Sequence, residues 1–221
     1  MFEFTTTAPI AAVLDIPAGR VELLATERTD TVVDVQPADP AKNRDVTAAE
    51  QTTVDYTDGV LRIRTSTPRN RVLTSSGAVA VTVHLPAGSR VEARSAAAEL
   101  RTVGRLGDVT FDGAYRQITI DEAASLNLTA VDGDVAVGRL GGPAQISTAR
   151  GDIRITAAER GTVVLRTQQG AITVGAAPGV SAALDAGTSH GRISNALKNN
   201  GTTELDIHAT TSQGDIIARS L

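Results

Sequence analysis

The sequence predicts an all-β fold, a β-solenoid of stacked two-strand coils of about 19 residues with a less regular β N-terminal cap. Three observations predict it. A Thr-x-x-Gly-x-Ile-x-Val pattern recurs in the second half of the chain, apolar and polar residues alternate within each repeat, and aromatic residues make up only 2% of the sequence. Aliphatic side chains must therefore build the core, and they suit the narrow interior of a layered β structure.

The glycine of this pattern marks each repeat, and it falls at Gly133, Gly151, Gly170, Gly191 and Gly214. Residues two and four positions after each glycine, and three, five and seven before it, are mostly aliphatic or Thr. This period-two alternation is typical of strands with one buried face. Each unit is therefore expected to hold two strands joined by a glycine turn. One coil cannot bury its apolar face alone, so neighbouring coils are expected to stack.

We expect one domain over residues 1–221, with an irregular β cap over 1–90 and regular coils over 91–221. The register continues backward through Arg116 and Ala98, which take the place of the glycine. Within the cap, apolar alternation predicts strands over 13–16, 20–23, 31–35, 59–63 and 79–83. Residues 37–50 are polar and rich in Ala, which indicates a loop or one short helix. Terminal units of repeat arrays are often atypical because they cover the column.

The Leu85-Pro86-Ala87-Gly88 sequence, followed by units such as Thr148-Ala149-Arg150-Gly151-Asp152-Ile153-Arg154-Ile155, resembles the DUF4097 family of bacterial β-strand-repeat proteins. The resemblance extends from about residue 10 to residue 221. It implies a β-solenoid-like fold, an adhesin-like role and no established biochemical activity.

Several segments match functional motifs but are better explained by the repeat. Gly187-Thr188-Ser189-His190-Gly191 matches the Gly-x-Ser-x-Gly motif, which requires a strand-to-helix turn. Here the segment is in register with the repeat turns. Asp152 and Asp215 follow turn glycines, as in calcium-binding repeats, but Ala171 and Arg192 occupy the same position in other units. The three His residues are far apart in sequence. We therefore predict no enzyme activity, no catalytic residues, no cofactor and no metal.

Arginine is concentrated in one part of a chain whose net charge is −4. Residues 62–105 contain eight Arg and only two Glu. Such asymmetry can mark an anion-binding surface, although a solvated face whose Arg stems cover apolar surface is the alternative. The candidate anion-contact residues are Arg62, Arg64, Arg69, Arg71, Arg90 and Arg94.

Three functions fit these features: a non-catalytic scaffold or protein-interaction module, a carbohydrate-binding or carbohydrate-active β-helix protein, and a self-assembling structural protein. Self-association is expected through a C-terminal edge formed by the strands around Gly214 to Arg219, because open strand edges invite pairing. The alternative is that the polar loop over residues 197–201 folds over this edge. No apolar run reaches the length of a membrane span, and no interleaved basic and aromatic residues indicate nucleic acid. Without a secretory signal, a cytoplasmic location is expected if Met1 is the natural start.

Overall fold

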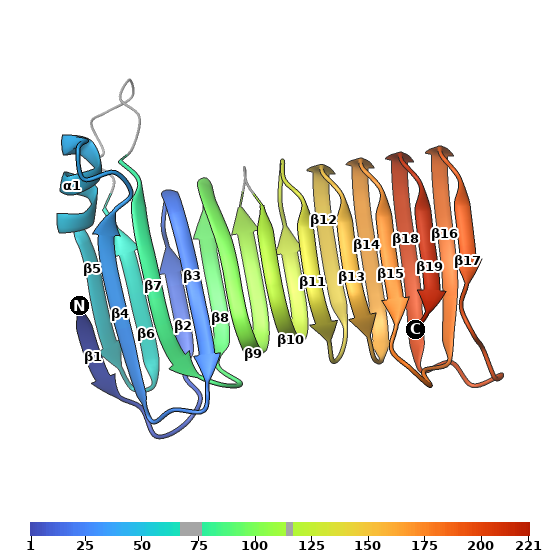
Figure 1. The fold of residues 1–221 in the computed structure, drawn as a ribbon, viewed down its shortest axis with the longest axis horizontal. Coiled ribbons are helices and arrows are strands. Elements are labelled where there is room, and N and C mark those ends of the chain that lie inside the picture. The colour runs from blue at the N-terminus through green and yellow to red at the C-terminus, as the bar shows by residue number, and fades with distance from the viewer. Residues whose placement is uncertain (67–76, 114–116) are drawn as a thin grey trace.

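The computed structural model describes residues 1–66, 77–113 and 117–221, which form an elongated column of strands (Figure 1). The predicted all-β fold is confirmed. Among the described residues the one helix, α1 (Asn43–Glu50), lies where the sequence indicated a loop or short helix. No helix in these residues is long and apolar enough to cross a membrane. The repeat position predicted at Arg116 lies outside the described residues.

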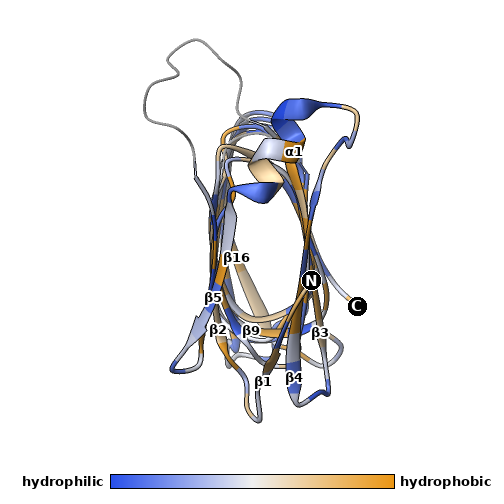
Figure 2. Cartoon of the chain, turned by 90° about the vertical axis from the view of Figure 1, so that its left-hand side faces the viewer, coloured by the Kyte–Doolittle hydropathy of each residue, from blue (hydrophilic) through white to orange (hydrophobic). Residues whose placement is uncertain are grey.

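The strands form two walls that face each other across the core (Figure 2). Wall A runs in spatial order through β1 (Phe2–Thr5), β4 (Asp30–Pro37), β7 (Val79–Pro86), β3 (Ala18–Thr26), the first parts of β9 (Ala97–Gly113) and β10 (Ile118–Thr129), β11 (Val135–Leu140), β13 (Ile153–Ala158), β15 (Ile172–Ala176), β19 (Ile216–Ser220) and β17 (Ile193–Ala196). Wall B runs through β5 (Thr52–Thr57), β6 (Val60–Thr65), β2 (Ala11–Asp15), β8 (Arg90–Ser95), the last parts of β9 and β10, β12 (Ala144–Arg150), β14 (Gly161–Gln169), β18 (Leu205–Gln213) and β16 (Ala182–His190). One strand of wall B and the next strand of wall A make one coil.

Equivalent residues of successive coils lie side by side, because the neighbouring strands of the column are parallel and in register. Ile153 pairs with Val135 on one side and with Ile172 on the other, and all three side chains are buried. On wall B, Ile146 pairs with Leu165 in the same way. The inward positions of the repeat therefore form continuous aliphatic rows, as the alternation predicted.

The spatial order of the last coils differs from their order in the sequence. Wall B runs β14–β18–β16 and wall A runs β15–β19–β17, so the coil β18–β19 lies between β14–β15 and β16–β17. The expectation that the strands around Gly214 to Arg219 form the edge is therefore wrong, because the edge consists of β16 and β17. Both coils carry the turn glycine, but the inward position four residues after it is Asn195 in β17 and buried Ala218 in β19. The polar Asn195 suits the edge coil.

The N-terminal coil, formed by β2 and β3, also lies out of its sequence order in the column. Strand β2 lies between β6 and β8, and β3 lies between β7 and β9. Residues 11–26 are thus part of the column, whereas β1, β4, α1 and β5 lie at its end (Figure 1). At this end the chain forms β2 and β3 first and the strands on both sides of them later. At the opposite end it forms β16 and β17 first and then β18 and β19, which lie between them and β14–β15.

The two ends of the column differ in how they are covered. At the end formed by β1, β4, α1 and β5, strands pair antiparallel, and the rings of Phe4 and Tyr56 pack with their centroids 5.3 Å apart. At the opposite end, β16 and β17 pair on one side only within the described chain. Their inward side chains Leu184 and Ala186 are half-buried, and Ile193 is 47% exposed. The second end is therefore open.

Candidate functional site

The Thr and Gly residues of the repeat hold one coil to the next. Thr167 Oγ1 donates a hydrogen bond of 3.1 Å to the carbonyl oxygen of Gly151 in the preceding coil. A Cβ atom added to Gly170 would lie 2.0 Å from that same oxygen, and the φ of Gly170 is +154°. Only glycine permits both this backbone and this approach. The motif is thus explained by coil stacking.

The Asp residues that follow the turn glycines also act between coils. Asp134 Oδ1 accepts a 2.8 Å hydrogen bond from the backbone N–H of Asp152, whose own Oδ1 accepts one of 2.7 Å from Ala171. The backbone N–H and the side chain of Arg192 hold the pKa of Asp215 below its ordinary value. Within the described parts of the chain, no cluster of His, Asp and Glu is placed to hold a metal ion.

Ser189 and His190 close the edge strand β16, and Gly191 follows them in the turn to β17. The Gly-x-Ser-x-Gly segment is therefore followed by a strand. The strand-to-helix turn that exposes a nucleophilic serine is not formed here.

The predicted arginines lie partly on the outer surface of wall B. Four of them lie there: Arg62, Arg64, Arg90 and Arg94. The other two, Arg69 and Arg71, lie outside the described residues. Their charges alternate with carboxylates across the strands, because Arg64 and Arg94 both pair in register with Asp15, and Arg94 with Asp112. Arg94 also donates a 3.3 Å hydrogen bond to Glu92. The arginines thus form part of a mixed-charge surface.

His208 connects the edge strand to its neighbour. Its Nδ1 lies 3.3 Å from Asp185 Oδ2 on β16, and its Nε2 lies 3.1 Å from Asp206 Oδ2 on β18. The hydrogen bond to Asp185, with the nearby charge of Asp206, raises the pKa of His208 above its ordinary value. Protonated His208 therefore attracts both carboxylates.

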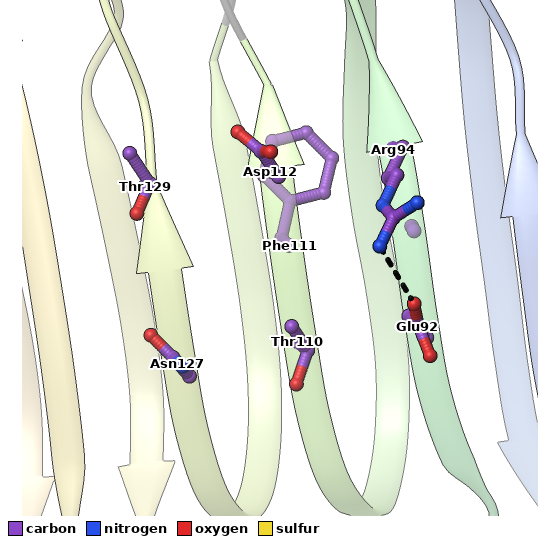
Figure 3. Close-up of a pocket in the computed structure, with 8 residues that line it drawn as sticks. Glu92, Arg94, Thr110, Phe111, Asp112, Asn127 and Thr129 are labelled. Atoms are coloured by element: carbon purple, nitrogen blue, oxygen red, sulfur yellow. Dashed lines mark hydrogen bonds and ion pairs between the residues drawn. The ribbon is translucent and has the colours of Figure 1, made fainter.

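Two shallow hollows lie on the outer surface of wall B. The first, of about 290 Å³, spans β8, β9 and β10 and includes Glu92, Arg94 and Asp112 (Figure 3). The second, of about 350 Å³, extends over β9, β10, β12 and β14. Thr110 and Asn127 line both hollows. The two hollows therefore adjoin one another along the column.

Six uncharged polar side chains, the neutral panel, lie along these hollows and beside them: Thr110, Asn127, Thr129, Gln145, Ser147 and Thr162. Asn127 pairs in register with Thr110 on one side and with Gln145 on the other. The panel side chains form no hydrogen bond with any other described residue. Their donors and acceptors are available to a ligand. The sequence pattern contained a signal for the panel, since its members are outward positions of successive wall B strands.

This architecture defines a class: an all-β repeat protein whose motif residues join its coils and whose outer wall carries shallow polar hollows. The chain belongs to the Toastrack DUF4097 family, whose model matches residues 13–219. The family resemblance in the sequence is therefore confirmed. No protein of curated function matches the chain.

Solved structures similar to this chain come from Bacteroides, Parabacteroides and Clostridium species. A structure described as a "putative adhesin" from Bacteroides fragilis is 14% identical, with a TM-score of 0.54, and the match covers 98% of this chain and 95% of that one. A "putative adhesin" from Parabacteroides merdae is 11% identical, with a TM-score of 0.43 and coverage of 100% and 93%. A "putative cell adhesion protein" from Clostridium sporogenes is 10% identical, with a TM-score of 0.38 and coverage of 100% and 99%. The likeness to the Bacteroides fragilis structure, at 14% identity, concerns the fold alone.

Proposed function

We propose that this protein is a non-catalytic, adhesin-like binding module, a β-solenoid scaffold that binds its partner on the outer surface of wall B. The neutral panel carries the proposal. The Thr, Gly and Asp residues of the repeat are engaged between coils, whereas the panel side chains have unused hydrogen-bonding groups beside two adjoining hollows. Ligand sites commonly combine a concave surface with a few free polar groups.

A pull-down from the cells that produce the protein tests this proposal. The panel variant Asn127→Arg/Gln145→Arg changes exposed side chains on wall B, and the control Thr156→Arg/Thr173→Arg makes the same change on wall A. We expect the wild type and the control to retain the same proteins or glycans and the panel variant to lose them. Equal retention by all three proteins, after far-ultraviolet circular dichroism has shown them folded, would contradict the proposal.

The open end supports a second function, self-association with another copy. Edge strands β16 and β17 have unpaired backbone groups and incompletely covered Leu184, Ala186 and Ile193. The other end is covered by α1 and the antiparallel strands, so the proposed contact joins two open ends. A two-fold axis that joins these ends reverses strand direction, so the contact would be antiparallel.

Light scattering after size-exclusion chromatography tests the second function. We expect a dimer for the wild type and a monomer for Ile193→Arg. Ile217→Arg is the matched control, because Ile217 is 40% exposed on the outer surface of wall A and Ile193 is 47% exposed at the open end. The control should stay dimeric. A wild-type monomer at high concentration, or equal loss of dimer in both variants, would remove this function.

A further inference from the structure

The middle of wall B has a row of uncharged polar side chains, for which wall A has no equivalent of the same length along these coils. Wall A carries charged side chains at outward positions of successive strands: Arg101, Arg105, Glu122, Arg139 and Arg154. The neutral panel on wall B holds only hydroxyl and amide groups. Charged residues border the panel, because Glu92, Asp112 and Arg166 pair in register with Thr110, Thr129 and Ser147.

The panel has the chemistry of a surface that binds uncharged hydroxyl groups. A hydroxyl or a carboxamide both donates and accepts hydrogen bonds, as each sugar hydroxyl does. The charges at the border of the panel are of both signs, so neither an anionic nor a cationic chain would find a uniform opposite charge along it. Asp108, the charged residue that lines the second hollow, already accepts a 2.6 Å hydrogen bond from Ser125.

The panel side chains lie in rows that run along the column. Thr110, Asn127 and Gln145 lie in register on neighbouring strands β9, β10 and β12, and Thr129 and Ser147 form a second row beside them. Neighbouring strands lie about 4.8 Å apart, so the groups recur at that interval along the column. This interval is close to the length of one sugar unit in an extended chain. The adjoining hollows of about 290 and 350 Å³ follow the same line.

We propose that the neutral panel binds an uncharged linear glycan, which lies along the column across β9, β10 and β12. This inference rests on the proposed function, since it names the ligand class of the same surface. Each strand supplies one or two hydrogen-bonding side chains to successive sugar units. Affinity should therefore rise with the length of the glycan until it spans the panel.

Nuclear magnetic resonance titration of the full chain tests the inference, because the side-chain amides of Asn127 and Gln145 give their own signals. The probes are cellohexaose, xylohexaose and mannohexaose as neutral chains, with oligogalacturonate as the acidic comparison. We expect at least one neutral chain at about 1 mM to shift both signals. Its disaccharide should bind more weakly, and oligogalacturonate should not shift them.

Variants separate a panel site from general surface binding. Asn127→Ala/Gln145→Ala should weaken binding by about tenfold, because it removes two hydrogen-bonding groups. Thr156→Ala/Thr173→Ala on wall A should leave affinity unchanged. The glycan inference fails if no neutral chain shifts the panel signals, if the acidic chain binds more tightly, or if the shifts map to wall A. In that event a pull-down that still depends on the panel would preserve the binding-module proposal with a different ligand.

Discussion

Thr211 Oγ1 donates a hydrogen bond of 3.0 Å to the carbonyl oxygen of Gly170, which lies 41 residues earlier in the chain. This contact joins β18 directly to the turn that follows β14. Thr188 of the edge strand in turn donates a 3.1 Å hydrogen bond to Gly214. The Thr-to-Gly contact thus joins coils that are neighbours in space, even where they are not neighbours in the sequence.

Replacing Thr211 by Val should destabilise the protein by about 1–3 kcal/mol, because the carbonyl of Gly170 loses its buried partner. Thr210→Val is the control, since Thr210 is exposed and Thr211 is 2% exposed. Urea unfolding followed by circular dichroism measures both. A loss of stability no larger for Thr211→Val than for Thr210→Val would show that the hydrogen bond contributes nothing measurable.

Replacing Gly214 by Ala should cost more than about 1–3 kcal/mol, the usual cost of an unfavourable backbone conformation. The φ of Gly214 is +145°, and a Cβ there would lie 2.0 Å from the carbonyl oxygen of Gly170. Gly187→Ala should be tolerated, because a Cβ at Gly187 meets nothing within 4 Å. Thermal unfolding of the two variants compares them. Equal melting temperatures would contradict the close approach of the coils.

Shortening Ile153 to Ala should destabilise the protein by about 2–5 kcal/mol, through lost apolar burial and the cavity left in the aliphatic row. The neighbouring Arg154→Ala, on the outer surface of wall A, should change stability by less than about 0.5 kcal/mol. Denaturant unfolding measures both. A cost below about 0.5 kcal/mol for Ile153→Ala would mean that the inward register is wrong.

Ser189 should be catalytically inert. Ser189→Ala should unfold like the wild type, and neither protein should hydrolyse p-nitrophenyl esters, because β16 is followed by a strand and not by a helix. Esterase activity present in the wild type and lost in this variant would overturn the non-catalytic assignment.

The attachment of the edge strand should weaken as the pH rises. Because Asp185 and Asp206 raise the pKa of His208 above 6.5, its stabilising contribution is complete below 6.5 and is lost as the pH rises through the raised value. Hydrogen exchange of the β16 amides, corrected for intrinsic rates, should show more protection near pH 5 than near pH 8. His208→Gln should remove the difference. An unchanged difference in that variant would assign it to other groups.

The alternation around Ile153 and Leu165 was enough to predict strands, inward faces and stacking, because burial enforces a period of two along each strand. The order of the last coils could not be predicted in this way. Gly191 and Gly214 sit in equivalent repeats, so the turn glycine does not show which of them stacks against Gly170. The one local signal was the inward position four residues later, which is Asn195 after Gly191 and Ala218 after Gly214.

The surfaces of the column follow from the sequence less directly than the fold does. Clustering in sequence drew attention to Arg62 and Arg64, but register places Asp15 beside Arg64 and Asp55 beside Arg62. The panel residues Asn127 and Gln145 come from different repeats, and their proximity depends on strand pairing. Local motifs therefore identify the residues that join the coils. Which outward residues become neighbours on the surface depends on how the strands pair.

The placement of β18–β19 between β14–β15 and β16–β17 has a consequence for how the protein is made. Residues 205–220 leave the ribosome after residues 182–196, yet they occupy the layer beneath them. The end of the column therefore cannot be built in the order of translation. Strands β16 and β17 can reach their final position only after the later segment has been synthesised and has packed against β14 and β15.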